Sequence, residues 1–305
     1  MLTSAGMLHL AVFLLMLRGT EPVSTYFYGF AWWTYIVFLS GVNHLRGKNS
    51  LLLDNPREFL WVFLFSTPVW LFFEIYNFRL NNWEYVGIPI ETYVRWPGYL
   101  ISFGTVLPGL FETETFLKNL GVARKVRARA LQVTQGLVNR LLVTGLLLML
   151  LPLWQPEFFF PMVWLGCIFI LDPIVYHLDQ PNASFLGQAK QGDYGLAARL
   201  LLAGMVCGGL WEFWNFWASA KWVYTIPYLG FLKAFEMPLL GFLGFPPFAL
   251  ECYLIYRCFS LFRERYLQGR RLVPALALMV LILYCSLTFA GIDRLTIESY
   301  KVTFY

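Results

Sequence analysis

Residues 59–78 read FLWVFLFSTPVWLFFEIYNF, a run of 20 residues in which Glu74 is the single charged side chain. A helix that crosses the hydrocarbon core of a bilayer needs about 20 mostly apolar residues. The rest of the chain has the same character, because 58% of its 305 residues are hydrophobic, 19% are aromatic and only 13% are charged. This composition excludes a water-soluble globular enzyme and a disordered segment. It predicts an all-α polytopic membrane protein.

Segments of this kind recur along the chain, so we expect about nine transmembrane helices. The shortest is the first. The nine predicted segments are Leu2–Leu17, Thr25–Leu45, Phe59–Phe78, Tyr93–Leu117, Gly136–Leu153, Phe158–Leu178, Leu196–Phe216, Leu229–Cys258 and Leu272–Gly291.

The distribution of basic residues predicts the orientation of the chain. Sixteen of the 23 Lys and Arg residues lie on the side of the connections after the second, fourth, sixth and eighth segments. Connections rich in Lys and Arg stay in the cytoplasm. We therefore expect an integral, multi-pass protein with a cytoplasmic amino terminus. The basic residues form no long patch, so we expect no nucleic-acid partner.

The sequence also resembles itself. The motif FEIYNF at residues 73–78 recurs as WEFWNF at residues 211–216, and three further elements recur in the same order, namely His44 as His177, Pro108 as Pro247, and Glu112 as Glu251. Aromatic composition alone does not make these polar residues and prolines recur in order. We therefore expect two parallel four-helix repeats, 1–133 and 134–266, followed by an extra helix in 267–305. Four helices per unit is an even number, so the copies are expected to share their orientation in the membrane.

Polar side chains within the predicted spans fall into two layers. Ionisable groups in lipid cost at least ~2.5 kcal/mol and normally face the protein interior. The outer layer, near the non-cytoplasmic face, is expected to shape a substrate pocket from Glu74, Asn77, Trp83, Glu212, Asn215, Trp222, Arg95 and Glu236. In a symmetric scaffold Arg95 and Glu236 are expected to form an ion pair. The alternative is that Glu and Asn only lock helices together through hydrogen bonds.

The inner layer, near the cytoplasmic face, contains His44, His177, Glu112, Glu251 and Asp172. Two His and two Glu residues are a suitable ligand set for zinc or non-haem iron. Their spacing matches no metal-binding motif, so the alternative is that each histidine is simply hydrogen-bonded. Beyond this metal, the sequence does not identify a cofactor.

The fourth and eighth segments are interrupted at matching places, by Pro97, Gly104 and Pro108 in one and by Pro238, Gly241 and Pro247 in the other. Proline removes a backbone donor and kinks a helix. Matching interruptions in two repeats are typical of a binding site between the repeats. Kinks that serve only packing are the alternative.

These elements resemble the duplicated, membrane-embedded lycopene cyclases of carotenoid biosynthesis. The similar pieces are residues 70–85 with 108–112, and residues 211–224 with 247–251. In that family two adjacent acidic residues follow the proline, whereas here a single acid follows it four positions later. The resemblance implies carboxylates that protonate an isoprenoid double bond without net redox change.

We therefore expect an enzyme that acts on a lipid or isoprenoid in the bilayer by cyclase- or isomerase-like acid/base chemistry. Glu112 and Glu251 are the expected acid/base groups, assisted by Glu74 and Glu212. Carboxyl groups placed among aromatic rings retain a transferable proton, and aromatic faces stabilise a carbocation. Two other functions stay open, a proton-coupled transporter built on parallel repeats and a non-catalytic scaffold or complex subunit.

Overall fold

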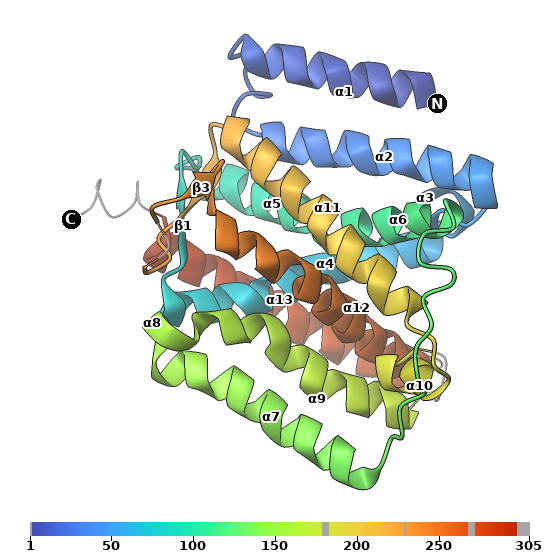
Figure 1. Cartoon of the computed structure of the whole chain (residues 1–305). Helices are drawn as coiled ribbons and strands as arrows, with labels where there is room; N and C mark the ends of the chain where they lie inside the picture. The colour runs from blue at the N-terminus through green and yellow to red at the C-terminus, as the bar shows by residue number, and fades with distance from the viewer. Residues whose placement is uncertain (1, 179–182, 229, 268–271, 298–305) are drawn as a thin grey trace.

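The computed structural model describes residues 2–178, 183–228, 230–267 and 272–297, and Figure 1 shows them as a bundle of helices. Among these residues, six segments are long and apolar enough to cross a membrane. They are Pro56–Leu80 (α4), Gln135–Trp154 (α7), Pro156–Leu178, Gly195–Trp217 (α11), Leu239–Tyr266 and Val273–Leu295. The chain is a multi-pass helical membrane protein, as its composition predicts.

Two of these segments contain more than one helical element, and another is part of a longer helix. The third joins α8 (Pro156–Phe159), η1 (Phe160–Met162) and α9 (Val163–Leu178). The fifth joins the 3₁₀ helix η2 (Leu239–Gly244), α12 (Phe245–Phe262) and the start of a π-helical turn, η3 (Arg263–Leu267). The sixth lies within α13 (Leu272–Leu295).

The first, second and fourth predicted segments are not among the six. They form α1 (Leu2–Leu17), α2 (Phe27–Gly47), and the pair α5 (Thr92–Phe103) and α6 (Val106–Asn119). Two short helices, α3 (Leu51–Asp54) and α10 (Phe185–Lys190), lie in connections. Residues 268–271 and 298–305 of the predicted third unit lie outside the described residues.

Both predicted interruptions are present as breaks in regular α-helix. α5 ends at Phe103 and α6 begins at Val106. Gly104 lies between them, where a Cβ atom would come within 2.4 Å of the Phe63 ring. In the second half η2 precedes α12, and two prolines occupy the first turn of α12. Proline is tolerated there because the first N–H groups of a helix make no hydrogen bond within the helix.

The helices pack in pairs around an aromatic core. α1 packs on α2 and α7 packs on α9, while α12 contacts both α9 and α11. Figure 1 shows α11 and α12 in the middle of the bundle, with α1 and α2 on one side and α7 and α9 on the other. Trp32, Phe27, Phe73 and Phe248 are among the largest fully buried side chains of this core.

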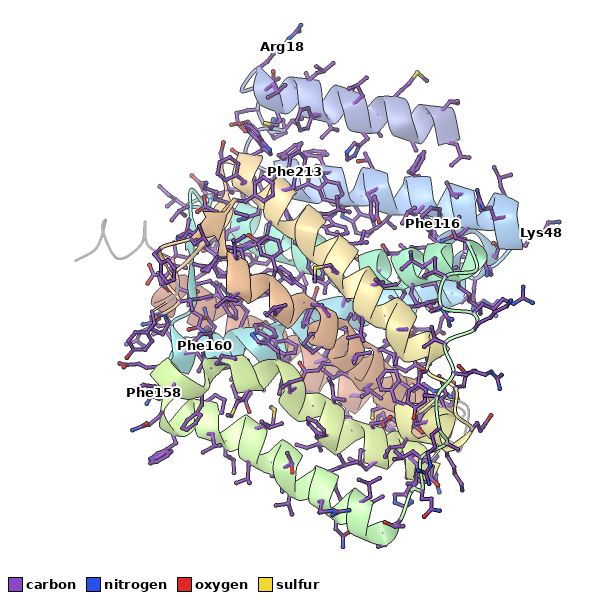
Figure 2. All side chains as sticks on the ribbon, in the orientation of Figure 1. Arg18, Lys48, Phe116, Phe158, Phe160 and Phe213 are labelled. Atoms are coloured by element: carbon purple, nitrogen blue, oxygen red, sulfur yellow. The ribbon has the colours of Figure 1, made fainter. Side chains whose placement is uncertain are left out.

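Small residues allow the closest helix approaches. A Cβ atom on Gly204 of α11 would lie 2.4 Å from the Phe245 carbonyl oxygen of α12, and one on Gly109 of α6 would lie 2.6 Å from the Trp32 ring. Inside a membrane, helices associate through such close packing, because lipid tails are as apolar as leucine. Outward faces carry exposed leucines, and Figure 2 shows the charged Arg18 and Lys48 at opposite ends of the α1–α2 pair.

Four short strands lie at the end of the bundle where α4 and α11 finish. β1 (Trp83–Val86) and β2 (Lys221–Tyr224) pair antiparallel, and β3 (Lys233–Ala234) and β4 (Met237–Pro238) form a second pair. The β1–β2 pair joins segments that follow equivalent motifs in the two halves of the sequence.

Candidate functional site

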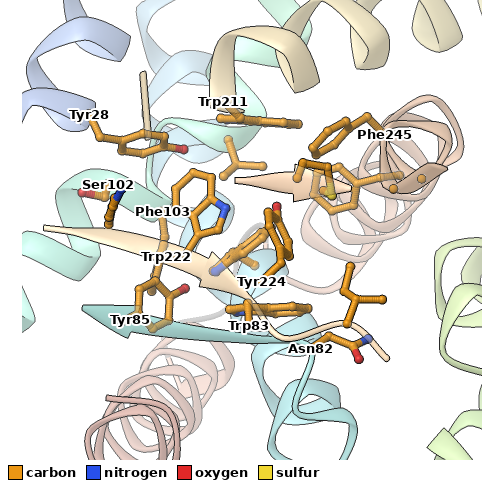
Figure 3. Close-up of a pocket in the computed structure, with 18 of the residues that line it drawn as sticks. Tyr28, Asn82, Trp83, Tyr85, Ser102, Phe103, Trp211, Trp222, Tyr224 and Phe245 are labelled. Atoms are coloured by element: carbon orange, nitrogen blue, oxygen red, sulfur yellow. The ribbon is translucent and has the colours of Figure 1, made fainter. Parts of the chain in front are cut away.

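A cavity of about 570 Å³ lies beside the β1–β2 pair, within the ~300–1,000 Å³ range typical of small-molecule sites. Its walls are mostly aromatic. Figure 3 shows Trp83, Tyr85, Trp222 and Tyr224 of the two strands around the same space as Tyr28, Trp211 and Phe245. The lining also includes Trp70, Tyr99, Phe103, Phe160, Trp164, Leu240, Leu243, Pro247 and Phe248.

Strand register places the four rings of β1 and β2 in two opposed pairs. Trp83 lies opposite Tyr224, and Tyr85 lies opposite Trp222. In the alignment of the two halves Trp83 matches Trp222 and Tyr85 matches Tyr224. Each tryptophan therefore faces the tyrosine of the other half, and both pairs line the cavity.

Glu74 of α4 holds one set of these rings from behind. Its Oε1 atom accepts hydrogen bonds from Trp70 Nε1 at 2.7 Å, from Trp83 Nε1 at 3.1 Å and from the Tyr85 hydroxyl. Its side chain is fully buried, and its Oε2 atom has no hydrogen-bond partner within the described ranges. The carboxyl group thus connects to the cavity through three side chains that line it.

Asn77, one helical turn after Glu74, anchors the start of β1. Its Nδ2 atom donates to the Trp83 carbonyl oxygen at 2.8 Å, and its Oδ1 atom accepts from the backbone N–H groups of Asn82 and Trp83. The three-residue spacing places both side chains on the same face of α4. Asn77 therefore fixes the backbone of the strand whose rings contact Glu74.

Glu212 and Asn215 make the same kinds of contact in the second half. Glu212 Oε1 accepts from the Tyr224 hydroxyl at 2.8 Å, and Asn215 accepts from Trp222 N and donates to Trp222 O. Both are fully buried. Gly208 occupies the position that matches Trp70, so Glu212 lacks the tryptophan donor that Glu74 receives from the helix.

Tyr85 and Tyr224 lie outside the helices that cross the membrane. Burial, followed by the adjacent Glu74 or Glu212 carboxylate, raises the pKa of each phenol well above its ordinary value of 10. Both hydroxyls therefore stay protonated at neutral pH and act as hydrogen-bond donors in the cavity wall.

The predicted ion pair between Arg95 and Glu236 is wrong. Arg95 lines the cavity but forms a two-point ion pair with Asp293 of α13, with N–O distances of 2.6 and 2.8 Å. Glu236 pairs with Lys221 of β2. The additional helix α13 packs on α4 and places its acid beside α5, whereas Lys221 and Glu236 lie close together in one connection.

Glu112 and Glu251 do not line the cavity. Glu112 is fully buried and accepts from Ser40 Oγ at 2.9 Å, Asn43 Nδ2 at 2.6 Å and Ser50 Oγ at 3.0 Å. These donors come from α2 and the following connection, so Glu112 ties α6 to both. Glu112, which the sequence predicts as an acid/base group, therefore does not contact this cavity.

Glu251 is also enclosed within its own half. Its Oε1 atom accepts from the backbone N–H of Cys167 at 2.9 Å, and its Oε2 atom has no hydrogen-bond partner in the part of the chain that the structure describes. Asp172 in the same half caps α10 by accepting from the backbone N–H groups of Phe185 and Leu186. Neither acid reaches the aromatic cavity.

The predicted metal ligands do not come together. Within the ranges that the structure describes, no group of three His, Cys, Asp or Glu side chains could hold a metal ion. His44 Nδ1 lies 2.7 Å from Asp54, whereas His177 is exposed beside the Tyr176 ring. Glu112 is already occupied by hydroxyl and amide donors.

Several cavity residues are absent from the sequence-based set. Tyr28, Trp164 and Phe248 line the cavity but are ordinary aromatic residues in aromatic-rich helices, and no local signal distinguishes them. Asp293 could have been found from the sequence, because it is the one acidic residue between Leu272, where the ninth predicted segment begins, and Leu295. Such an acid needs a partner in the protein interior.

No family model, no curated protein and no solved structure matches this chain. The resemblance to lycopene cyclases therefore stays a prediction. Function has to be inferred from the cavity and from the groups that hold its walls.

Proposed function

We propose that the protein is an integral membrane enzyme that binds a lipid or isoprenoid in the aromatic cavity and isomerises or cyclises it by acid/base chemistry. One observation carries this proposal. Two tyrosines, Tyr85 and Tyr224, line the cavity, and each donates a hydrogen bond from its hydroxyl to a buried carboxyl group, Glu74 or Glu212. The acid/base groups are thus Glu74 and Glu212, while Glu112 and Glu251 tie helices together.

The chemistry follows from this pairing. Tyr85 transfers its proton to one carbon of a double bond, while the Glu74 carboxyl group, in its protonated form, returns a proton to the Tyr85 oxygen. The resulting carbocation is stabilised by the surrounding rings. A neighbouring carbon then loses a proton through Tyr224 to ionised Glu212, after which Glu74 takes up one proton from solvent and Glu212 releases one, so that both carboxyl groups regain their starting states. The substrate keeps its formula and its oxidation state, so this class of reaction consumes no oxidant or reductant.

The proposal includes an architecture of nine passes in two parallel repeats, 1–133 and 134–266, with α13 as the ninth pass. The β1–β2 register supports it, because equivalent strands that pair antiparallel with mutual exchange of partners are related by a twofold axis. On this arrangement the amino terminus and the connection 120–134 are cytoplasmic. A reporter inserted between Arg124 and Arg129 should give a cytoplasmic signal, and one fused after Tyr305 should give a signal from the opposite side.

Lipid extracts of cells with and without the gene test the activity. We expect a product of unchanged mass and altered double-bond or ring pattern only in cells that hold the gene. The double variant Glu74→Gln with Glu212→Gln should abolish it, because an amide cannot supply the carboxyl proton. Glu157→Gln is the matched control, since Glu157 is exposed on α8. Full activity in the double variant would reject the assignment.

A second comparison separates the two pairs of acids. Glu112→Gln should lower the amount of folded protein but leave the activity per folded molecule close to that of the original chain, because Glu112 contacts Ser40 and Asn43 and not the cavity. Loss of activity in well-folded Glu112→Gln would return the acid/base role to the inner layer.

A further inference from the structure

The cavity has one polar end. Thr25, Tyr26, Arg95 and Lys221 line it there. Two contacts bring them together. Ala220 N, next to Lys221, donates to the Thr25 carbonyl oxygen, and the Tyr26 ring lies 3.4 Å from the Cβ position of Gly98, which follows Arg95 by one turn of α5. The Tyr26 hydroxyl is buried and has no hydrogen-bond partner among the residues that the structure describes.

Neither a cation nor an anion suits this end. Arg95 and Lys221 line the cavity, so a cation would meet like charges, and an anion would have to compete with the Asp293 and Glu236 carboxylates that already pair with them. A neutral hydroxyl or carbonyl group meets no such repulsion and can bond to the Tyr26 hydroxyl. Leaving a buried hydroxyl unpartnered costs ~1–3 kcal/mol.

The opposite end of the cavity is apolar and reaches the outer surface. Trp164 and Leu165 of α9 line it together with Leu240, Leu243 and Gly244 of η2. The Cβ position of Gly244 lies 3.4 Å from the Trp164 ring, so the two elements are adjacent. Leu240 and Leu243 are 61% and 65% exposed although they line the cavity. Side chains that are exposed on one side and face the cavity on the other mark an opening with an apolar rim.

Aromatic contacts link the two ends. Tyr28 of α2 lies 5.1 Å from Trp222, and Trp83 lies 6.4 Å from Trp164 of α9, as measured between ring centroids. The paired strands β1 and β2 join Trp222 to Trp83. Figure 1 shows α2 and α9 on opposite sides of α11 and α12, and the lining residues Tyr28 and Trp164 come from these two helices.

Further polar atoms of the walls also lack a hydrogen-bond partner within the described part of the chain. Trp211 Nε1 can donate and Asn82 Oδ1 can accept a hydrogen bond, and both residues are more than nine-tenths buried. Buried polar atoms normally have partners. A pure hydrocarbon provides none, whereas a ligand with an oxygen function can provide one.

We propose that the ligand is a neutral single-chain amphiphile whose oxygen-bearing end lies at Tyr26 and whose hydrocarbon end lies in the opening between α9 and η2, through which it enters from the bilayer. This inference rests on the proposed function and narrows its substrate class. At ~30 Å³ per water-sized atom the cavity accommodates roughly 20 non-hydrogen atoms, which is the size of a 20-carbon prenyl alcohol.

Binding of three probes to the full-length protein in nanodiscs tests the polar end. The probes are geranylgeraniol, a branched hydrocarbon of the same length and geranylgeranyl diphosphate, each measured by quenching of tryptophan fluorescence. We expect the alcohol to bind at least tenfold more tightly than the other two. Tyr26→Phe should reduce this preference three- to tenfold and leave hydrocarbon binding unchanged. Equal binding of alcohol and hydrocarbon, or tighter binding of the diphosphate, would overturn the inference.

A pair of variants tests the opening. Leu243→Trp places a larger side chain in the rim and should weaken alcohol binding at least tenfold. Phe231→Trp is the matched control, because Phe231 is 83% exposed in the same connection and does not line the cavity. Equal affinities in both variants would overturn the proposed opening. Failure of all three probes to bind the original protein would instead reject the proposed function, on which the inference rests.

Discussion

Trp83 and Tyr224 lie directly opposite each other in the antiparallel β1–β2 pair, although one follows the fourth helix of the chain and the other follows the eleventh. Each is tied to a buried carboxyl group of its own half, Trp83 to Glu74 and Tyr224 to Glu212. The strand pair therefore couples two acid–aromatic clusters across one cavity.

The asparagines that fix the strands should matter for stability. Asn77→Ala removes one donor to Trp83 O and an acceptor for two backbone N–H groups, and buried groups that lose partners cost ~1–3 kcal/mol each. We expect the free energy of unfolding in detergent to fall by about 3 kcal/mol, with weaker ligand binding. Asn139→Ala, at an exposed position that bonds only Gln135 among the contacts described for it, should change stability by less than ~0.5 kcal/mol. Similar losses in both variants would contradict the anchoring role.

The Arg95–Asp293 pair should couple α5 to α13. Removing either partner leaves a buried charge, so Arg95→Ala and Asp293→Ala should each lower the free energy of unfolding by ~3–5 kcal/mol. Replacing both, as Arg95→Ala with Asp293→Ala, should cost less than the sum of the two single changes. Additive losses in this double-mutant cycle would show that the two residues do not depend on each other.

Glycine substitutions on α11 should separate the effect of helix–helix contact on stability from the effect of helix propensity. Gly204→Ala puts a methyl group 2.4 Å from the Phe245 carbonyl oxygen and should destabilise the protein by ~1–3 kcal/mol. Gly209→Ala, on the same helix with nothing within 4 Å of its Cβ position, should be neutral or stabilising by up to ~1 kcal/mol, because alanine favours helix. Thermal unfolding of both variants in one detergent gives the answer, and the reverse order would contradict the packing of α11 on α12.

High pH should destabilise the folded protein through its buried tyrosines. The pKa of Tyr85 and Tyr224 is raised in the fold, so the unfolded chain releases these protons near pH 10 while the folded chain keeps them. Their contribution to stability is complete below pH 10 and is lost as the pH rises above it. Unfolding measured between pH 8 and 11.5 should show this loss, and Tyr85→Phe with Tyr224→Phe should reduce its slope. An unchanged slope would contradict the burial of both phenols.

The candidate site was predictable where its residues lie close together in the sequence. Glu74, Asn77 and Trp83 follow one another within ten positions, so helical spacing and the loop that follows already group them, and the second half repeats the pattern with Glu212, Asn215 and Trp222. The structure brings each group together. The prediction that the inner layer forms one site was wrong. The repeat in the sequence places equivalent residues at the same depth in the membrane, but it does not determine the direction in which Glu112 or Glu251 points.

Hydropathy by itself determined that this chain is a helical membrane protein, because about 20 apolar residues in a row can satisfy their backbone groups in lipid only as a helix. Only the tertiary structure decided that Arg95 binds Asp293 and that Glu112 is enclosed by Ser40 and Asn43. It also decided that Tyr85 and Tyr224 connect the buried acids Glu74 and Glu212 to the cavity. Apolar periodicity is a local property, whereas ion pairs and cavity walls depend on which helix faces meet, and in lipid that choice is made by close packing between helices distant in the sequence.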